Sequence, residues 1–175
     1  MKVGLVGLGN LGTPIATNLH KAGFPLTVYD LRRETASKLL SRGVNWAGSP
    51  QAVAEQSDTV FTVLPTPAAV AAVVEGENGL LAGLRSGATW IDISTTDGRE
   101  TQRLALLCAA RGIDVLEAPM TGGIPLAHQG KMTVLVGGER AVFDRNLAVL
   151  GTIGGKIFYM GPLGSAAVAK VLTNM

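Results

Sequence analysis

The stretch Val3-Gly-Leu-Val-Gly-Leu-Gly-Asn-Leu-Gly12, close to the start of the chain, decides the fold. Its first four residues form a short apolar run that ends in glycines, which indicates a buried strand. Residues 13–22 carry apolar side chains at helical spacing and stop at Gly23, which indicates a helix. A strand, a G-x-G-x-x-G turn and a helix in this order are typical of the first unit of a dinucleotide-binding fold.

Each position of the turn Gly7-Leu8-Gly9-Asn10-Leu11-Gly12 has an expected part in holding a dinucleotide. Gly7 permits the tight turn, Gly9 lets the backbone approach the pyrophosphate, and Gly12 lets helix and strand pack closely. Asn10 and Leu11 complete the turn, and the helix N-terminus offers free N–H groups to the phosphates. The alternative is a glycine-rich turn that binds nothing, but the strand before it and the helix after it favour a nucleotide site.

An acid follows the second expected strand, at the position that selects the cofactor. Asp30 comes directly after the apolar residues 26–29 and is expected to accept hydrogen bonds from the adenosine ribose hydroxyls. This favours NAD, because its charge would repel a 2′-phosphate. Arg32 and Arg33 keep NADP open as the alternative, since an arginine just past this strand can bind that phosphate.

Strands and helices alternate along the rest of the chain, which predicts an α/β fold with a doubly wound, mostly parallel sheet of the Rossmann type. Apolar runs predict further strands, and helical spacing predicts further helices. The expected strands are residues 44–47, 59–64, 89–93, 114–117, 132–136 and 156–159, and the expected helices are 34–41, 50–56, 68–74, 99–110 and 139–150.

The composition excludes several classes of protein. The 175 residues are 47% hydrophobic and 16% charged, enough to build a core. A net charge of +2 gives no footprint for nucleic acid. No apolar run is long enough to span a membrane, and no metal-binding spacing is present. The single cysteine, Cys108, lies in an apolar run, so we expect a buried, reduced thiol and a cytoplasmic location.

Four stretches together resemble the β-hydroxyacid dehydrogenase family, which includes 3-hydroxyisobutyrate dehydrogenases, tartronate semialdehyde reductases and glyoxylate/succinic semialdehyde reductases. They are the glycine turn with its helix, Ile91-Asp-Ile-Ser-Thr95, Glu117-Ala-Pro-Met-Thr-Gly-Gly123 with its continuation to Gly138, and the segment from Gly164 to Asn174. The chain departs from the family pattern at four positions, where it has Gly98, Thr121, Ala166 and Thr173. Thr121 replaces a usual serine and keeps the hydroxyl.

The resemblance implies an oxidoreductase that moves hydride between NAD(P) and a small 3-hydroxy acid or its semialdehyde. It implies that Thr121, Gly122 and Gly123 bind the substrate carboxylate, and backbone N–H groups around glycines do form anion-binding concavities. Further cofactor contacts are expected at the ends of two strands. Leu64 and Pro65 are expected to wall the nucleotide, and Ser94 and Thr95 to contact the nicotinamide ribose or carboxamide.

Lys170 and Asn174 are the expected catalytic residues. They are four apart, so one helix face carries both. Reduction of an aldehyde needs a proton donor at the carbonyl oxygen, and a lysine can serve if its pKa falls to roughly 7–8. Asn174 would hold the reacting oxygen. Taken without the resemblance, a lysine on such a helix is more often merely solvated.

The end of the chain suggests a domain boundary. Residues 1–163 are expected to form the dinucleotide-binding domain, and 164–175 the start of an interdomain helix. The resemblance implies that this helix leads to an all-helical domain absent from the chain, through which the full-length protein forms a homo-oligomer. We therefore expect the 175-residue chain to bind cofactor but to turn over poorly.

The sequence is also compatible with two other functions. The first is a non-catalytic dinucleotide-binding module, which need not keep both Lys170 and Asn174. The second is an imine reductase, a related group of enzymes that generally lacks the lysine.

Overall fold

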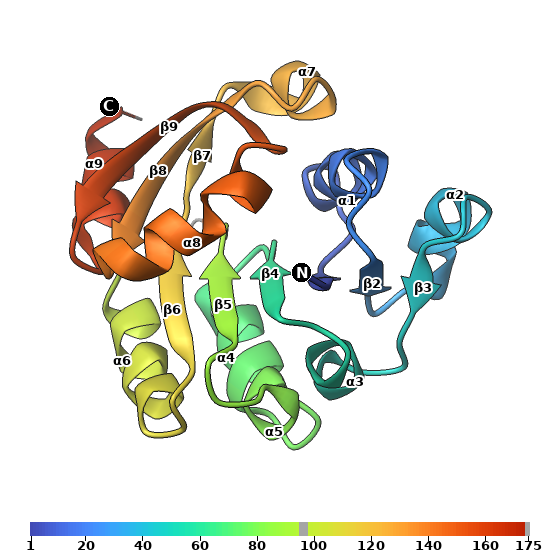
Figure 1. Cartoon of the computed structure of the whole chain (residues 1–175), viewed down its shortest axis with the longest axis horizontal. Helices are drawn as coiled ribbons and strands as arrows, with labels where there is room; N and C mark the ends of the chain where they lie inside the picture. Colours follow the sequence, from blue (N-terminus) through green and yellow to red (C-terminus); the bar gives the residue numbers. More distant parts are fainter. Residues whose placement is uncertain (95–97, 174–175) are drawn as a thin grey trace.

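The computed structural model describes residues 1–94 and 98–173. This part of the chain forms one nine-stranded sheet covered by helices on both faces (Figure 1). The strands are β1 (Val3–Val6), β2 (Leu26–Tyr29), β3 (Asn45–Trp46), β4 (Thr59–Thr62), β5 (Thr89–Asp92), β6 (Asp114–Glu117), β7 (Met120–Thr121), β8 (Met132–Gly138) and β9 (Gly154–Gly161). The fold class predicted from the sequence is confirmed.

The first six strands are parallel and lie in the order β3-β2-β1-β4-β5-β6. Strand β8 then pairs antiparallel with β6, and β9 pairs parallel with β8. Strand β7 continues β6 along the same ladder, because Glu117 faces Gly137 and Met120 faces Val134 in one unbroken register. Thr121 therefore lies beyond the carboxyl end of β6, in line with that strand.

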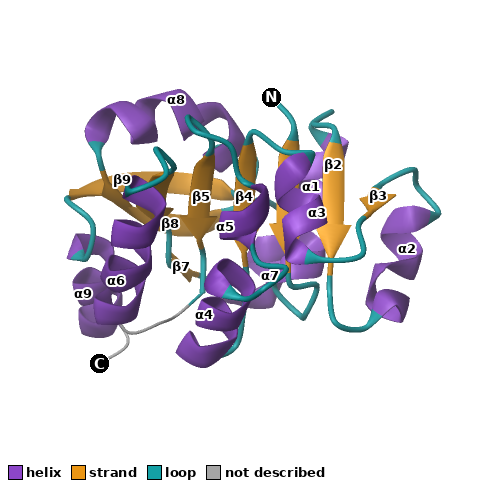
Figure 2. Cartoon of the chain, turned by 90° about the horizontal axis from the view of Figure 1, so that it is seen from below, coloured by secondary structure: helices purple, strands orange, loops and turns teal. Residues whose placement is uncertain are grey.

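Helices follow most strands and pack on the two faces. They are α1 (Gly12–Lys21), α2 (Ser37–Leu40), α3 (Pro50–Glu55), α4 (Pro67–Glu75), α5 (Leu80–Gly83), α6 (Gly98–Ala109), α7 (Gly123–His128), α8 (Arg140–Leu150) and α9 (Ser165–Thr173), and a 3-10 turn, η1 (Arg33–Ala36), precedes α2. Figure 1 and Figure 2 show α9 at the β8–β9 end of the sheet, where it packs against β8 and β9.

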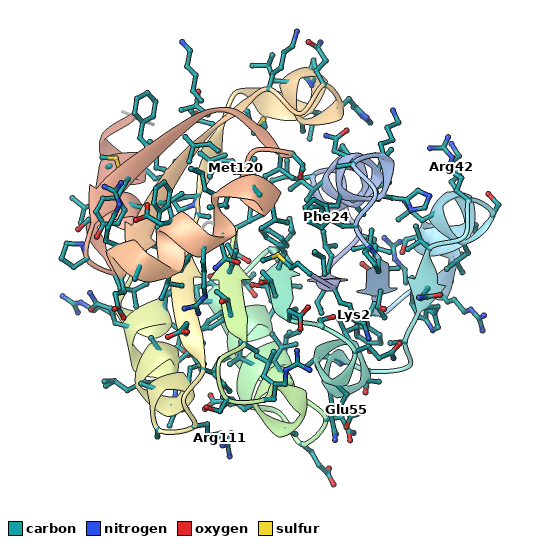
Figure 3. The ribbon with its side chains drawn as sticks, in the orientation of Figure 1. Lys2, Phe24, Arg42, Glu55, Arg111 and Met120 are labelled. Atoms are coloured by element: carbon teal, nitrogen blue, oxygen red, sulfur yellow. The ribbon has the colours of Figure 1, made fainter. Side chains whose placement is uncertain are left out.

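Alternation along the strands sends side chains into two separate cores. Leu5 packs with α1, α2, α7 and α8 on one face, whereas its neighbour Val6 packs with α3, α4, α5 and α6 on the other. Trp90, fully buried, fills the second core. Figure 3 shows charged side chains such as Arg42 and Glu55 projecting outward. A sheet covered on both faces explains why its strands are apolar runs rather than alternating ones.

The structure adds elements that the sequence analysis did not predict. Helix α5, strand β7 and helix α7 are short, and two-turn or two-residue elements give little periodic signal. The expected helix 34–41 is divided into η1 and α2. The expected strand 59–64 ends at Thr62, because Leu64 and Pro65 already belong to the loop that leads to α4.

Two smaller observations concern membrane spans and the cysteine. Among the described residues, no helix is long and apolar enough to cross a membrane. Cys108 is buried and has no disulfide partner, and burial raises the pKa of its thiol to about 12, so the thiol stays protonated at neutral pH.

Candidate functional site

The sheet reverses its winding direction between β1 and β4. The chain leaves β1 for α1 on one face and leaves β4 for α4 on the other, while the two strands lie side by side. Such a switch point opens a crevice at the carboxyl ends of the strands, where ligands bind in open α/β sheets. The glycine turn, Leu64 and Ser94 all lie at this edge.

The three glycines of the turn meet different surroundings. Gly7 has φ +100°, and a Cβ there would clash with the Val63 carbonyl oxygen. A Cβ on Gly12 would clash with the Gly7 carbonyl oxygen. A Cβ on Gly9 would have nothing within 4 Å. The turn itself therefore requires glycine at positions 7 and 12. Gly9 instead leaves open space that a ligand phosphate can occupy.

The N-terminus of α1 is equipped for an anion. No described side chain caps it, and its first turn contains no acid. Ser49 caps α3 and Thr66 caps α4, each accepting a hydrogen bond from a backbone N–H, whereas α2, α5, α7 and α8 resemble α1 in having no side-chain cap. An uncapped helix start beside open space at Gly9 offers unsatisfied N–H groups and a partial positive charge. These features fit a dinucleotide pyrophosphate.

Asp30 joins β2 to the glycine turn. Its Oδ2 accepts a hydrogen bond from the Leu8 N–H at 2.7 Å, and its Oδ1 accepts one from the Arg32 N–H at 2.9 Å. The carboxylate is only partly buried, and each of its oxygens can accept a further hydrogen bond. Asp30 is thus placed beside the turn, as a ribose-binding acid must be, and it also holds the turn in shape.

The ends of β4 and β5 are tied by a buried hydrogen-bond network. The Leu64 N–H donates to the Ser94 hydroxyl oxygen at 2.9 Å, and Asp92 Oδ1 accepts from the Ser94 N–H and from the Thr62 hydroxyl. The network holds Leu64 just beyond the carboxyl end of β4, with Pro65 exposed beside it. Thr95 lies outside the described residues.

Thr121, Gly122 and Gly123 form the turn between β7 and α7. Gly122 has φ +131° and Gly123 has φ +78°, conformations that other residues rarely adopt. Both glycines are exposed and Thr121 is half-buried. The pair therefore has a conformational reason to be glycine, and it exposes backbone at the far end of the β6–β7 ladder.

Lys170 lies in α9 and is only 9% exposed. Lysines are almost never this buried unless they have partners or a function, so the solvated alternative for this residue is wrong. Asn174, four residues further on, lies outside the described residues. The structure thus places one of the two expected catalytic residues in a buried setting.

Sequence reasoning missed the contacts at the start of α9, the helix that carries Lys170. Glu117, 4% exposed, ends β6, and its carboxylate accepts hydrogen bonds from the backbone at the start of α9. Burial raises the pKa of Glu117, and the hydrogen bonds from Ala166 and Gly164 oppose that rise. The partners are 47 and 49 residues away in the chain, so no local pattern could have revealed them.

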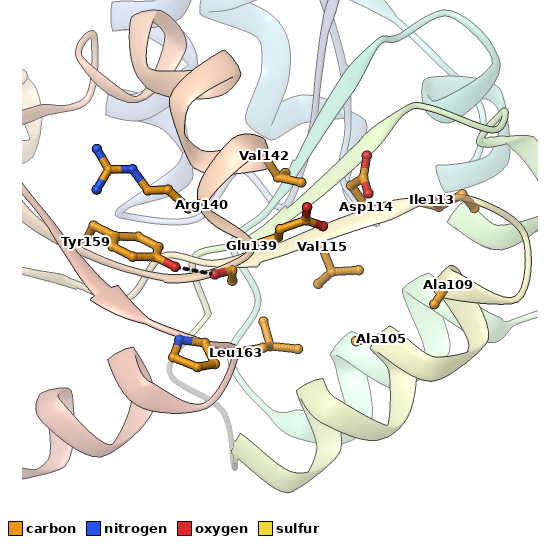
Figure 4. Close-up of a pocket in the computed structure, with 12 residues that line it drawn as sticks. Ala105, Ala109, Ile113, Asp114, Val115, Glu139, Arg140, Val142, Tyr159 and Leu163 are labelled. Carbon is orange, nitrogen blue, oxygen red and sulfur yellow. Dashed lines mark hydrogen bonds between the residues drawn. The ribbon is translucent and has the colours of Figure 1, made fainter.

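A groove of about 530 Å³ lies elsewhere, between α6 and the start of α8 (Figure 4). Its lining includes Ala105, Asp114 and Arg140, and the Tyr159 hydroxyl donates to the Gly138 carbonyl oxygen at its wall. It reaches the beginning of β6, away from the glycine turn. Among the described residues there is also no cluster of histidine, cysteine or acidic side chains that could hold a metal.

Comparison with protein families supports the assignment of the glycine turn. The family model described as the NAD binding domain of 6-phosphogluconate dehydrogenase matches residues 2–161. This range contains the turn, Asp30 and the Thr121–Gly123 segment, and it ends just before α9.

Individual relatives extend the similarity through α9. The chain is 34% identical to 2-(hydroxymethyl)glutarate dehydrogenase from Eubacterium barkeri, with 100% of this chain and 58% of that protein covered. It is 37% identical to mitochondrial 3-hydroxyisobutyrate dehydrogenase from Rattus norvegicus, with 99% and 52% covered.

A solved structure shows the same architecture. The structure of Mycobacterium tuberculosis 3-hydroxyisobutyrate dehydrogenase with L-serine matches with a TM-score of 0.92 and 31% identity, covering 99% of this chain and 58% of that one. The chain therefore spans about half the length of the relatives that it matches.

Proposed function

The chain belongs to the family of the NAD binding domain of 6-phosphogluconate dehydrogenase, and from this premise we propose that it serves an oxidoreductase acting on a small 3-hydroxy acid or its semialdehyde. The observation that carries the proposal is the presence, in one domain, of an open glycine turn and a buried lysine, Lys170. A buried lysine needs a partner or a function, and a proton-transferring role at the reacting oxygen supplies such a function.

The cofactor is proposed to lie across the crevice between β1 and β4. Gly9 and the uncapped start of α1 receive the pyrophosphate, and Asp30 accepts from the adenosine ribose. Asn10 and Leu11 complete the turn, and Leu64 and Pro65 form a wall. When bound, the nicotinamide supplies the hydride or accepts it. The acid at position 30 supports NAD over NADP.

The substrate carboxylate is proposed to bind at Thr121, Gly122 and Gly123. The threonine hydroxyl and the exposed backbone of the two glycines supply hydrogen-bond donors for an anion. A small acid held by its carboxylate at this turn would present its reacting carbon toward the crevice edge. The side chain of the acid is left open by this arrangement.

Lys170 is proposed to hold or move the proton at the reacting oxygen. During reduction its ammonium group donates a proton to the carbonyl oxygen, and during oxidation its amine takes the hydroxyl proton. The low exposure of Lys170 keeps bulk water away from this exchange. Asn174 is proposed to hold the same oxygen by a side-chain hydrogen bond, and Ser94 and Thr95 to contact the nicotinamide end.

The remaining parts of the proposal concern the whole protein. Residues 1–163 are proposed as the dinucleotide-binding domain and 164–175 as the beginning of the helix that leads to a second, helical domain. We place the protein in the cytoplasm, as a homo-oligomer. The buried, reduced Cys108 supports a reducing compartment, and the half-length match to the relatives supports a second domain.

The direct test is reduced-nicotinamide absorbance with a panel of small semialdehydes. It uses the full natural protein that contains these 175 residues. We expect NADH to be consumed with a semialdehyde that carries a carboxylate, and not with the matched aldehyde that lacks it. Cyclic imines are tested as substrates in the same assay.

The outcomes separate the candidate functions. Consumption of NADH only with imines would contradict the hydroxy-acid proposal and support an imine reductase. Tight NADH binding without turnover of any semialdehyde, aldehyde or imine would support a non-catalytic binding module.

A further inference from the structure

The carboxylate of Glu117 holds the start of α9. Its Oε1 accepts hydrogen bonds from the backbone N–H groups of Gly164 and Ala166, each at 2.7 Å. The Ala166 N–H belongs to the first turn of the helix, and Gly164 directly precedes that turn, so neither N–H group has a partner within the helix itself. Bonds to a charged acceptor are stronger than neutral ones, and a negative charge at a helix N-terminus is stabilised by the helix dipole.

The neighbouring strand leaves room for this carboxylate. Gly137 of β8 lies opposite Glu117 in the ladder, and a Cβ there would clash with Glu117 Oε1. Gly137 does not have a positive φ, so its own backbone conformation does not require glycine. The space around the Glu117 carboxylate is therefore a reason for glycine at position 137.

The N-terminal turn of α9, which Glu117 holds, lies directly before Lys170. Ala166 and Lys170 are four residues apart, so about one turn and roughly 6 Å of helix separate them. Helix α9 has nine residues, too few for a stable isolated helix. Its position must therefore come from contacts with the rest of the domain, and Glu117 supplies two of them at the end nearest the sheet.

We propose that Glu117 is a positioning residue whose carboxylate fixes the first turn of α9, and with it Lys170, against the end of β6. The inference rests on the proposed catalytic role of Lys170. Glu117 itself contacts neither substrate nor cofactor in this account. It acts through the helix, and a misplacement of 1 Å at a reacting group can cost roughly 10²-fold in rate.

The experiment compares two variants of Glu117 and one of Gly137 with one control in the full natural protein. Glu117→Ala removes the acceptor, Glu117→Gln keeps an oxygen but loses the charge, and Gly137→Ala crowds the carboxylate without changing it. The control is Asp114→Asn, which removes one negative charge, together with its ion pair to Arg145, from the other end of β6, away from α9.

Two readouts require no substrate. Amide hydrogen exchange at Gly164 and Ala166 reports whether their hydrogen bonds to Glu117 are intact. The rate at which an acylating reagent labels Lys170 reports the position of the lysine. We expect Glu117→Ala to speed exchange by roughly ten- to a hundredfold, the range for hydrogen bonds to charged groups. Labelling of Lys170 should become faster, and Glu117→Gln and Gly137→Ala should give smaller changes of the same sign.

Kinetics supply the third readout. In Glu117→Ala kcat should fall by at least roughly tenfold, while the NADH dissociation constant stays unchanged, because α9 lies apart from the glycine turn. Unchanged exchange and labelling would overturn the inference, as would equal losses of kcat and NADH affinity. If Glu117→Ala fails to fold, Glu117→Gln decides by the same criteria. A wild-type protein without turnover would instead count against the proposed function. The exchange and labelling results would still test whether Glu117 fixes the start of α9.

Discussion

At the scale of single residues, the glycine turn separates structural from functional glycines. A Cβ on Gly12 meets the Gly7 carbonyl oxygen, whereas a Cβ on Gly9 meets nothing within 4 Å. Gly12→Ala should therefore destabilise the fold by about 1–3 kcal/mol, the usual cost of overpacking. Gly9→Ala should leave stability unchanged and weaken NADH binding, because the methyl group occupies the space proposed for the pyrophosphate.

Thermal unfolding and NADH titration of the same samples check both statements. Gly48→Ala is the matched control, since a Cβ there also has nothing within 4 Å and it lies on another loop. It should change neither quantity. NADH affinity that survives Gly9→Ala intact would show that the pyrophosphate does not approach this glycine.

Asp30 carries the choice between the two cofactors. Its carboxylate is held by Leu8 and Arg32 N–H groups, which leaves a fixed negative charge beside the turn. We expect NADH to bind at least tenfold more tightly than NADPH, about 1.4 kcal/mol. Titration of both reduced cofactors measures the ratio, and Asp30→Asn should lower it. A tenfold preference for NADPH would contradict this account and assign the 2′-phosphate to Arg32 or Arg33.

Glu117 predicts a pH dependence of stability. Burial raises its pKa in the folded protein above the unfolded value, so the folded state binds more protons between those two values. The contribution of Glu117 to stability is then fully present below the unfolded pKa and is lost as pH rises through the folded pKa. The unfolding free energy of wild type minus that of Glu117→Gln should increase as the pH is lowered from neutral toward the unfolded glutamate pKa of about 4.3.

Chemical denaturation across this range measures the difference. Asp114→Asn again controls for the loss of one acid on the same strand. A difference that stays flat, or that decreases on acidification, would show that the carboxyl group is not held in a desolvated position.

At the scale of elements, the β7–α7 turn tests the proposed substrate site. Thr121→Val keeps the shape of the side chain and removes the hydroxyl that is proposed to bind the carboxylate. KM for a carboxylate-bearing substrate should rise by about fivefold to tenfold, the worth of one net hydrogen bond of 1–1.5 kcal/mol. The NADH dissociation constant should stay unchanged.

Thr152→Val is the control for that substitution, because the Thr152 hydroxyl donates to the Val149 carbonyl at the end of α8, away from the β7–α7 turn. Steady-state kinetics of both variants with one semialdehyde provide the comparison. An equal effect of the two substitutions on KM, or a parallel loss of NADH affinity in Thr121→Val, would mean that the β7–α7 turn is structural.

The same elements show where sequence patterns succeed and where they stop. The buried parallel strands β1, β4 and β5 were predicted because two covered faces produce continuous apolar runs. Strand β7 has two residues and was missed, because its existence depends on pairing with β8 and not on a pattern of its own.

The candidate site divides in the same way. The glycine turn and Asp30 form a local motif of known spacing, so the sequence placed them on the correct elements. The Glu117 contacts to α9 and the hydrogen bond from Leu64 to Ser94 join segments 30 or more residues apart. Contacts of that kind follow from the packed sheet and leave no local signal.

At the scale of the whole molecule, the sheet connects two groups that are proposed to act together. The glycine turn opens at β1, and α9 with Lys170 packs at the β8–β9 end. The strand order β1-β4-β5-β6 spans the distance between them at one edge of the sheet. A rigid sheet can therefore hold a cofactor and a proton-transferring lysine in fixed relation, which is the requirement for hydride transfer.

The most direct test of this account is Lys170→Ala in the full natural protein, with turnover and the NADH dissociation constant measured on the same sample. Turnover should fall by at least roughly 10²-fold, the usual scale of general acid–base catalysis, while NADH affinity stays unchanged. Turnover retained near the wild-type level would contradict the proposed role of Lys170.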